Sequence, residues 1–247
     1  FTLFGLDKYL FGEFFKNRVK PLNLIGSSAG AFRAAALCQK NPVEAIKRLA
    51  YEYAHTKYSK NPTPNEISAN AIDIISTLFG KHGAKEVIEN KRFRAHFLVA
   101  KCNGLTAFDN KLAQGTGLVA SMLLNKIDRR LLNQQYQRCI FKQPHSELSI
   151  DDPYCFKNTY HDLTEGNIKA AVLASGSIPL IMSGVKNIHG TELGTYRDGG
   201  IIDYHFDFSL NKPTQSIEQA LTLYPHFTNV PKAGWFYKKS KRKVLNT

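Results

Sequence analysis

The sequence predicts an α/β fold in which a mostly parallel central sheet is covered by helices on both faces. Short apolar runs, of the length of buried strands, alternate with longer segments whose apolar residues recur every three or four positions, as in helices. Strands separated by helices favour parallel pairing, because a parallel connection needs a crossover. With 247 residues, 43% of them hydrophobic, and no internal repeat or low-complexity linker, we expect one domain over residues 1–247.

The individual elements follow from apolar spacing and from turn signals. Apolar residues between Leu3 and Phe15 fall on one helical face, and Asn41 before Pro42 suits the start of a helix. In chain order we expect a helix over 3–15, a strand over 22–25, a tight turn over 26–30, helices over 31–39 and from 41 onward, a loop over 60–65, helices over 67–79 and 84–90, a strand over 96–100, helices over 118–132 and 165–173, a strand edge and turn over 196–202, and a short strand over 220–223.

The charge is strongly positive, with 33 basic and 20 acidic residues and a net charge of +13. Such a field favours polyanions, either nucleic acid or an anionic membrane surface. Nucleic acid is the weaker of the two, because no recognition helix, zinc knuckle or aromatic platform is recognisable. A basic tail at about 235–247 follows three aromatic residues from Trp235 to Tyr237, which suits either a membrane interface or a solvated tail.

The compartment is indicated by the cysteines and by the absence of targeting signals. Four cysteines without a CxxC pair are typical of reduced, mostly buried thiols in an intracellular protein. No signal peptide is recognisable, and the apolar stretch 170–185 is too short and too broken to span a bilayer. We therefore expect a cytoplasmic, peripherally membrane-associated protein, with secretion left open.

A candidate nucleophile lies in the turn after the first predicted strand. The turn matches the pattern G-x-S-x-G, which places a serine between a strand and a helix, as Gly26-Ser27-Ser28-Ala29-Gly30. Side chains at the two glycines are expected to collide with neighbouring chain, and the helix N-terminus after Ser28 stabilises negative charge. The alternative is a glycine turn that only packs strand against helix. A phosphate site is disfavoured, since no Gly-Lys-Ser/Thr follows.

A candidate base lies much later in the chain. Asp198 precedes Gly199 and Gly200, so its carboxylate is expected on a tight turn that aims it at a cleft. Asp203, five residues on, competes for the same role. We rank Asp198 first because two glycines follow it.

Together these segments resemble those of the patatin-like phospholipases. Residues 25–31 are similar to that family's nucleophile turn, residues 197–200 to its Asp-Gly-Gly/Ala motif, and residues 170–179 to the helix and Ser-x-x-Pro-type segment before its aspartate. The resemblance implies a three-layer α/β/α domain and a Ser28–Asp198 dyad without histidine. It also implies hydrolysis of phospholipid or lysophospholipid esters through a Ser28 acyl-enzyme, with no cofactor and no metal.

The chain departs from this family at its start. The family's glycine-rich loop, whose backbone N–H groups form the oxyanion hole, would fall before Phe1, and Gly5 and Gly12 are poor substitutes for it. Because Phe1 is not an initiator methionine, we expect the loop upstream of this sequence. If it is absent, the alternative is a non-catalytic lipid-binding or regulatory module on the same fold.

A Ser-His-Asp triad is the other alternative. The order Ser28, Asp198 and then His205 or His226 would suit an α/β-hydrolase esterase. Against it, only 27 residues precede the serine, where that fold builds several strands first. Metal catalysis is disfavoured, because no histidine, cysteine or carboxylate group has metal-ligand spacing.

Overall fold

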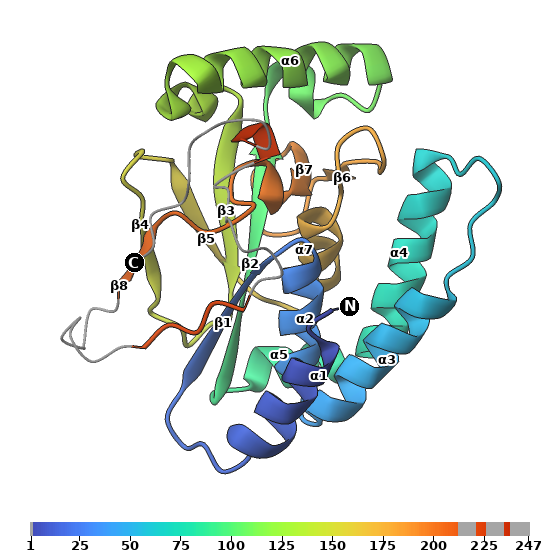
Figure 1. Ribbon diagram of the computed structural model, residues 1–247, viewed down its shortest axis with the longest axis vertical. Helices are drawn as coiled ribbons and strands as arrows, with labels where there is room; N and C mark the ends of the chain where they lie inside the picture. The colour runs from blue at the N-terminus through green and yellow to red at the C-terminus, as the bar shows by residue number, and fades with distance from the viewer. Residues whose placement is uncertain (1, 212–220, 226–234, 238–247) are drawn as a thin grey trace.

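A six-stranded sheet forms the centre of the computed structural model, which describes residues 2–211, 221–225 and 235–237 (Figure 1). Its strand order is β5-β3-β2-β7-β6, and β1 also pairs with β2. The strands are β1 (Leu22–Ser27), β2 (Phe93–Cys102), β3 (Tyr136–Lys142), β5 (Asn158–Asp162), β6 (Val185–Lys186) and β7 (Thr195–Asp198). Two further strands, β4 (Ser149–Asp151) and β8 (Ser209–Asn211), form a separate antiparallel ribbon.

The sheet is mixed, so the expectation of a mostly parallel sheet is wrong. β1 is parallel to β2 and β3 to β5, whereas β2–β3, β2–β7 and β6–β7 are antiparallel. A helix between two strands predicts parallel pairing only if it crosses a face of the sheet. Helix α6 (Lys111–Ile127) instead lies across the end of the sheet, so the chain leaves β2 and returns along β3 in the opposite direction (Figure 1).

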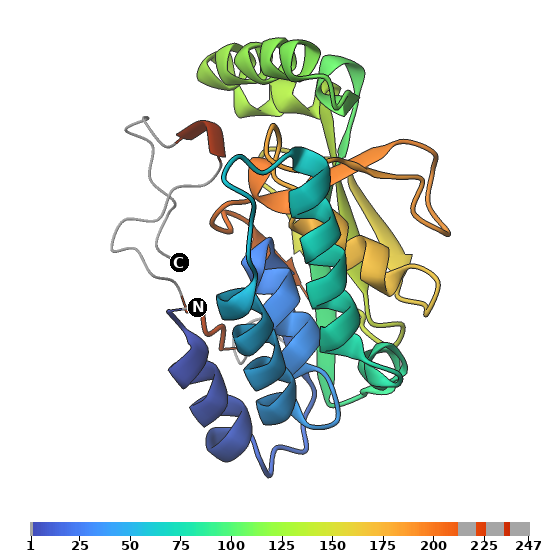
Figure 2. The same ribbon diagram turned by 90° about the vertical axis from the view of Figure 1, so that its right-hand side faces the viewer.

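Helices pack against one face of the sheet and form one helical layer of the α/β fold. Every second residue of β2 from Phe93 to Val99 points into a core shared with these helices. Figure 2 views the molecule from this helical side. The helices are α1 (Phe4–Tyr9), which continues as the π-helical turn η1 (Leu10–Phe14), α2 (Ala29–Leu37), α3 (Pro42–His55), α4 (Pro64–Phe79), α5 (Gly83–Glu89) and α7 (Ile168–Ser175).

The opposite face carries a second, smaller core cluster. Ala100, Cys102 and Tyr136 from the sheet meet side chains from η3 (Arg129–Gln134) and η4 (Gly199–Ile201). Trp235 and Phe236, from the short turn η6 (Trp235–Tyr237), pack against this cluster. The aromatic start of the expected basic tail is therefore bound to the protein itself, and residues 238–247 lie outside the described part of the chain.

Several sequence expectations need correction. The strands β3, β4, β5, β6 and β8 were not predicted from the sequence, and residues 221–225 have no regular structure where a strand over 220–223 was predicted. α6 begins at Lys111, seven residues before the expected helix, and ends at Ile127. Across the described residues, no helix combines the length and apolar composition that crossing a membrane requires.

Candidate active site

Ser28 lies at a sharp turn between strand and helix, as the G-x-S-x-G pattern predicts. β1 ends at Ser27, α2 begins at Ala29, and Ser28 between them has φ 53° and ψ −126°. A positive φ is unusual for a residue with a side chain and is stable only where the surroundings hold it. The Ser28 N–H is held by Ser175, donating to its carbonyl oxygen at 3.0 Å and to its Oγ at 3.1 Å.

The two glycines of the turn differ in what they require. A Cβ at Gly26 would lie 2.2 Å from the carbonyl carbon and oxygen of Gly30 and 2.5 Å from the Ala31 nitrogen, so the turn closes only with glycine there. A Cβ at Gly30 would have no heavy atom within 4 Å. The expected collision is therefore confirmed at Gly26 and wrong at Gly30, where space is open beside the first turn of α2.

This difference predicts opposite outcomes for two alanine substitutions. Gly26→Ala should destabilise the fold by several kcal/mol, on the order of an overpacked core residue or more, because backbone must move. Gly30→Ala should leave the free energy of unfolding unchanged or raise it by up to about 1 kcal/mol, since alanine favours helix over glycine. Urea unfolding of both variants measures this, and equal destabilisation would contradict the turn geometry.

The register of the sheet brings Asp198 to the serine turn. β3 pairs with one edge of β2, and β1 and β7 both pair with the other edge. Ser27 lies opposite Leu98, and Asp198 lies opposite the next residue, Val99. Because β1 runs parallel and β7 antiparallel to β2, the two strands end facing each other. A Cβ at Gly199 would lie 2.3 Å from the Leu98 oxygen and 2.9 Å from Ser27 Oγ, so the two turns are in contact.

A third segment, after α7, ties the two turns together. The Ser175 Oγ donates to the Leu98 carbonyl at 2.7 Å while Ser175 receives the Ser28 N–H. Two residues on, the Ser177 carbonyl accepts the Asp198 N–H at 3.1 Å. Sequence reasoning identified this segment only as part of a family pattern. Its positioning role depends on hydrogen bonds to chain far away in the sequence.

The two candidate carboxylates have different partners. Asp198 is buried at the start of η4, and its Oδ1 accepts the Gly200 N–H at 2.7 Å. Asp203 receives Arg138 through two bonds, Nε to Oδ2 at 2.6 Å and Nη2 to Oδ1 at 2.8 Å. Arg129 approaches Asp203 Oδ1 at 3.5 Å. Asp203 is thus the carboxylate of a buried ion-pair network, whereas Asp198 ends the strand that faces the serine turn.

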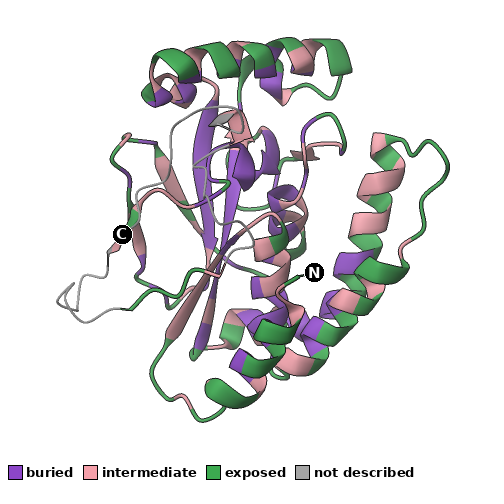
Figure 3. Ribbon diagram, viewed as in Figure 1, coloured by how far each residue is buried: buried purple, intermediate pink, exposed green. Residues whose placement is uncertain are grey.

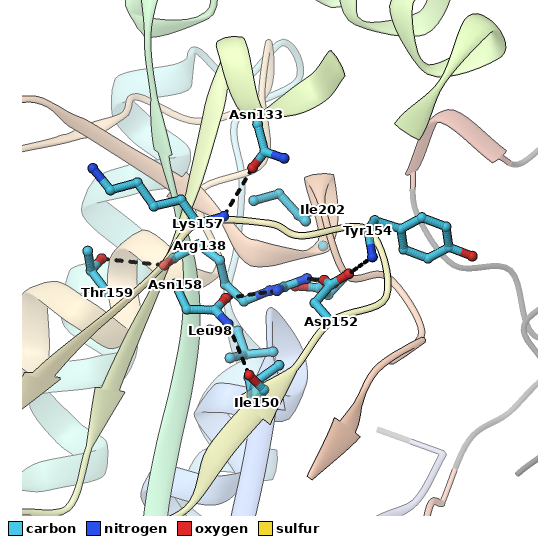
Figure 4. A network of polar contacts seen from close by, with 12 residues as sticks. Leu98, Asn133, Arg138, Ile150, Asp152, Tyr154, Lys157, Asn158, Thr159 and Ile202 are labelled. Carbon is cyan, nitrogen blue, oxygen red and sulfur yellow. Dashed lines mark hydrogen bonds and ion pairs between the residues drawn. The ribbon is translucent and has the colours of Figure 1, made fainter. Parts of the chain in front are cut away.

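The network around Arg138 supports the turn that follows Asp198. Arg138 also binds Asp152 at 2.5 Å and Asn158 at 2.9 Å, as Figure 4 shows. The Asp203 N–H donates to the Gly199 carbonyl at 2.9 Å. The network therefore holds the chain on the far side of the Asp198-Gly199-Gly200 turn.

The candidate histidines can be placed only in part. His205 is buried, with its ring 5.1 Å from that of Tyr204 and 6.2 Å from that of Tyr224. His226 is among the residues that the structure does not describe. Within the described ranges, no group of three or more histidine, cysteine or acidic side chains could hold a metal ion.

Comparison with known proteins identifies the family of the chain. The family model described as Patatin-like phospholipase matches residues 13–205, a range that contains Ser28, Asp198 and the segment that joins them. No curated protein matches the chain. Because the family match spans well over half of the sequence, the chain belongs to the patatin-like phospholipase family.

Proposed function

We propose that this protein hydrolyses acyl esters of phospholipids or lysophospholipids through an acyl-enzyme on Ser28, with Asp198 as the general base. Membership of a family of lipid acyl hydrolases supports the reaction class. The observation that carries the assignment of residues is the register of β2, which sets the ends of β1 and β7 at adjacent positions.

The proposed reaction has two halves. In the first, Ser28 Oγ attacks the ester carbonyl carbon while Asp198 takes the hydroxyl proton, and the tetrahedral intermediate collapses as Asp198 returns that proton to the leaving alcohol. In the second, a water molecule attacks the Ser28 acyl ester and gives its proton to Asp198. Asp198 then protonates Ser28 Oγ, and the fatty acid leaves.

The oxyanion of each intermediate needs backbone donors. The Ser28 N–H is already bound to Ser175, so it does not serve. The first N–H groups of a helix have no partner within the helix, and its N-terminus favours negative charge. The Ala29 and Gly30 N–H groups of α2 are therefore the proposed donors on this side. A glycine-rich loop of the kind found in this family would supply the others.

A fluorophosphonate probe tests the activated serine directly. We expect the probe to label the wild-type protein on Ser28, because an activated serine attacks phosphorus and an inert one does not. Ser28→Ala should not be labelled, and Asp198→Asn should be labelled far more slowly. Peptide mapping by mass spectrometry gives the site.

One further variant and the result for the wild-type protein separate the alternatives. His205→Asn should be labelled at the wild-type rate under the dyad mechanism, whereas loss of labelling would favour a Ser-His-Asp triad. A folded wild-type protein that resists the probe would favour a non-catalytic lipid-binding module.

We further propose peripheral association with the cytoplasmic side of an anionic membrane, supported by the net charge of +13.

A further inference from the structure

Helix α6 turns its polar and small residues toward the protein. Gln114, Gly117, Ser121 and Asn125 are buried on its inner side. Ser121 Oγ lies 2.9 Å from the Tyr136 hydroxyl, and Gln114 Nε2 donates to the Phe108 carbonyl at 2.9 Å. The inner face is thus fixed by hydrogen bonds, with only Leu118 as a large buried apolar side chain.

The outer side of α6 is apolar and exposed. Leu112, Val119, Leu123 and Ile127 have exposed fractions of 81%, 54%, 53% and 78%. Their spacing of seven, four and four residues places them on one stripe of the helix. A surface helix of a soluble protein normally turns such a stripe toward the core. In α6 the apolar stripe instead faces away from the protein. Figure 3 shows exposed residues along the outer side of α6.

The charges on and beside this stripe are basic or neutralised. α6 contains Lys111 and Lys126, both exposed, and no acidic residue. The carboxylates that flank the helix already have basic partners. These are Asp109, with Arg197 and Lys186, and Asp128, with Arg130.

α6 is also connected to the candidate active site. The Leu180 N–H donates to Gln114 Oε1 at 2.5 Å, which binds α6 to the segment that follows Ser177. Leu180 and Ile181 are exposed apolar residues of this segment, and the Ser177 carbonyl holds the Asp198 backbone. α6 is therefore hydrogen-bonded, through its inner face, to a segment that itself exposes apolar side chains and contacts the Asp198 turn.

We propose that the outer face of α6 docks on an anionic lipid surface, lying in the interface with its apolar stripe inserted among the acyl chains and its lysines at the headgroups. This inference rests on the proposed function for its choice of a lipid partner. From Leu112 to Ile127 the stripe is about 22 Å long at 1.5 Å per residue, enough to contact several lipids. The exposed lysines and the lack of free carboxylates on α6 favour an anionic surface over a second copy of this equally basic chain.

Vesicle binding by the full chain carrying Ser28→Ala tests the proposal without turnover of the lipid. We expect binding to phosphatidylcholine vesicles that contain phosphatidylglycerol and weaker binding to phosphatidylcholine alone. Val119→Ser with Leu123→Ser should weaken binding by about 100-fold, roughly tenfold for each inserted side chain. Lys111→Gln with Lys126→Gln should remove most of the preference for phosphatidylglycerol and its sensitivity to salt.

A matched control uses Val19, in the loop before β1, and Ile72, in α4, which are both exposed aliphatic residues. Val19→Ser with Ile72→Ser should bind vesicles like the parent, and circular dichroism verifies that every variant is folded. In protein that retains Ser28, hydrolysis of a soluble short-chain ester should be the same with and without the α6 substitutions. If that ester is not cleaved, the proposed function fails while vesicle binding still tests α6.

Three results would overturn the proposal. The first is that the Ser28→Ala parent does not bind vesicles, and the second is that the α6 and control variants bind them equally. The third is that light scattering shows a dimer which the α6 substitutions dissociate. The last result would assign the face to a second copy of the chain.

Discussion

Replacing Ser28 by alanine should lower the rate of phospholipid hydrolysis by a factor on the order of 10⁶, the size of the loss when a hydrolase loses its nucleophile. Without Oγ no acyl-enzyme can form, while the turn should survive because its fixed contact is made by the Ser28 backbone N–H. Release of fatty acid from radiolabelled or fluorescent phospholipid, followed under single-turnover conditions, measures the effect.

The neighbouring serine provides the matched control. Ser27 Oγ is buried and has no hydrogen-bond partner among the described residues, so Ser27→Ala removes a buried hydroxyl at little cost in stability. It should retain the wild-type rate. Full activity in Ser28→Ala, or an equal loss in Ser27→Ala, would contradict the assignment of the nucleophile.

The base is tested in the same assay. Asp198→Asn keeps the shape of the side chain and can still accept the Gly200 N–H, but an amide cannot take the Ser28 proton. We expect a loss of roughly 10²- to 10⁴-fold in kcat, the usual contribution of a general base. An unchanged KM would separate this loss from a change in substrate binding.

The candidate site was predictable because its two turns are local. Glycine is required at positions 26 and 199 because other backbone comes too close for a side chain. At Gly26 this is the backbone of residues 30 and 31, and at Gly199 it is the Leu98 carbonyl. That the turns meet could not be read from spacing, since it depends on β1 and β7 sharing one side of β2. The family resemblance supplied that link.

The sheet was harder to predict because the sequence of β3 does not look like that of a buried strand. Arg138 and Gln137 interrupt its apolar pattern, yet both are buried. Burial of Arg138 is possible because carboxylates from distant segments pair with its charge. The pattern of α6 misled in a different way. Apolar spacing predicted a helix near Leu118, Met122 and Ile127, but only Leu118 faces the protein. Periodicity identifies an apolar face and does not say what covers it.

Replacing Arg138 should also have a large effect on stability. Burial alone would lower the pKa of Arg138, but the facing carboxylates Asp203 and Asp152 outweigh it and raise the pKa above its ordinary value. The guanidinium therefore stays charged. It is the cation that pairs with Asp152 and the nearer of two that face Asp203, the other being Arg129. Arg138→Met should destabilise the protein by about 3–5 kcal/mol, because it leaves buried negative charge unpaired. Urea unfolding measures this value.

A double substitution tests whether pairing is the cause. If the cost comes from unpaired charge, Arg138→Met combined with Asp203→Asn should be less destabilised than the sum of the two single variants, because fewer buried charges remain unpaired. Arg130→Met provides the control, since Arg130 and Asp128 form an Arg–Asp pair on the surface, where solvent screens it, and its loss should change stability little. Additive losses at Arg138 and Asp203 would mean that packing, rather than charge, carries the effect.

Because the Asp203 N–H also donates to the Gly199 carbonyl, we expect the Arg138 variant to lose hydrolysis as well, through displacement of the Asp198 turn.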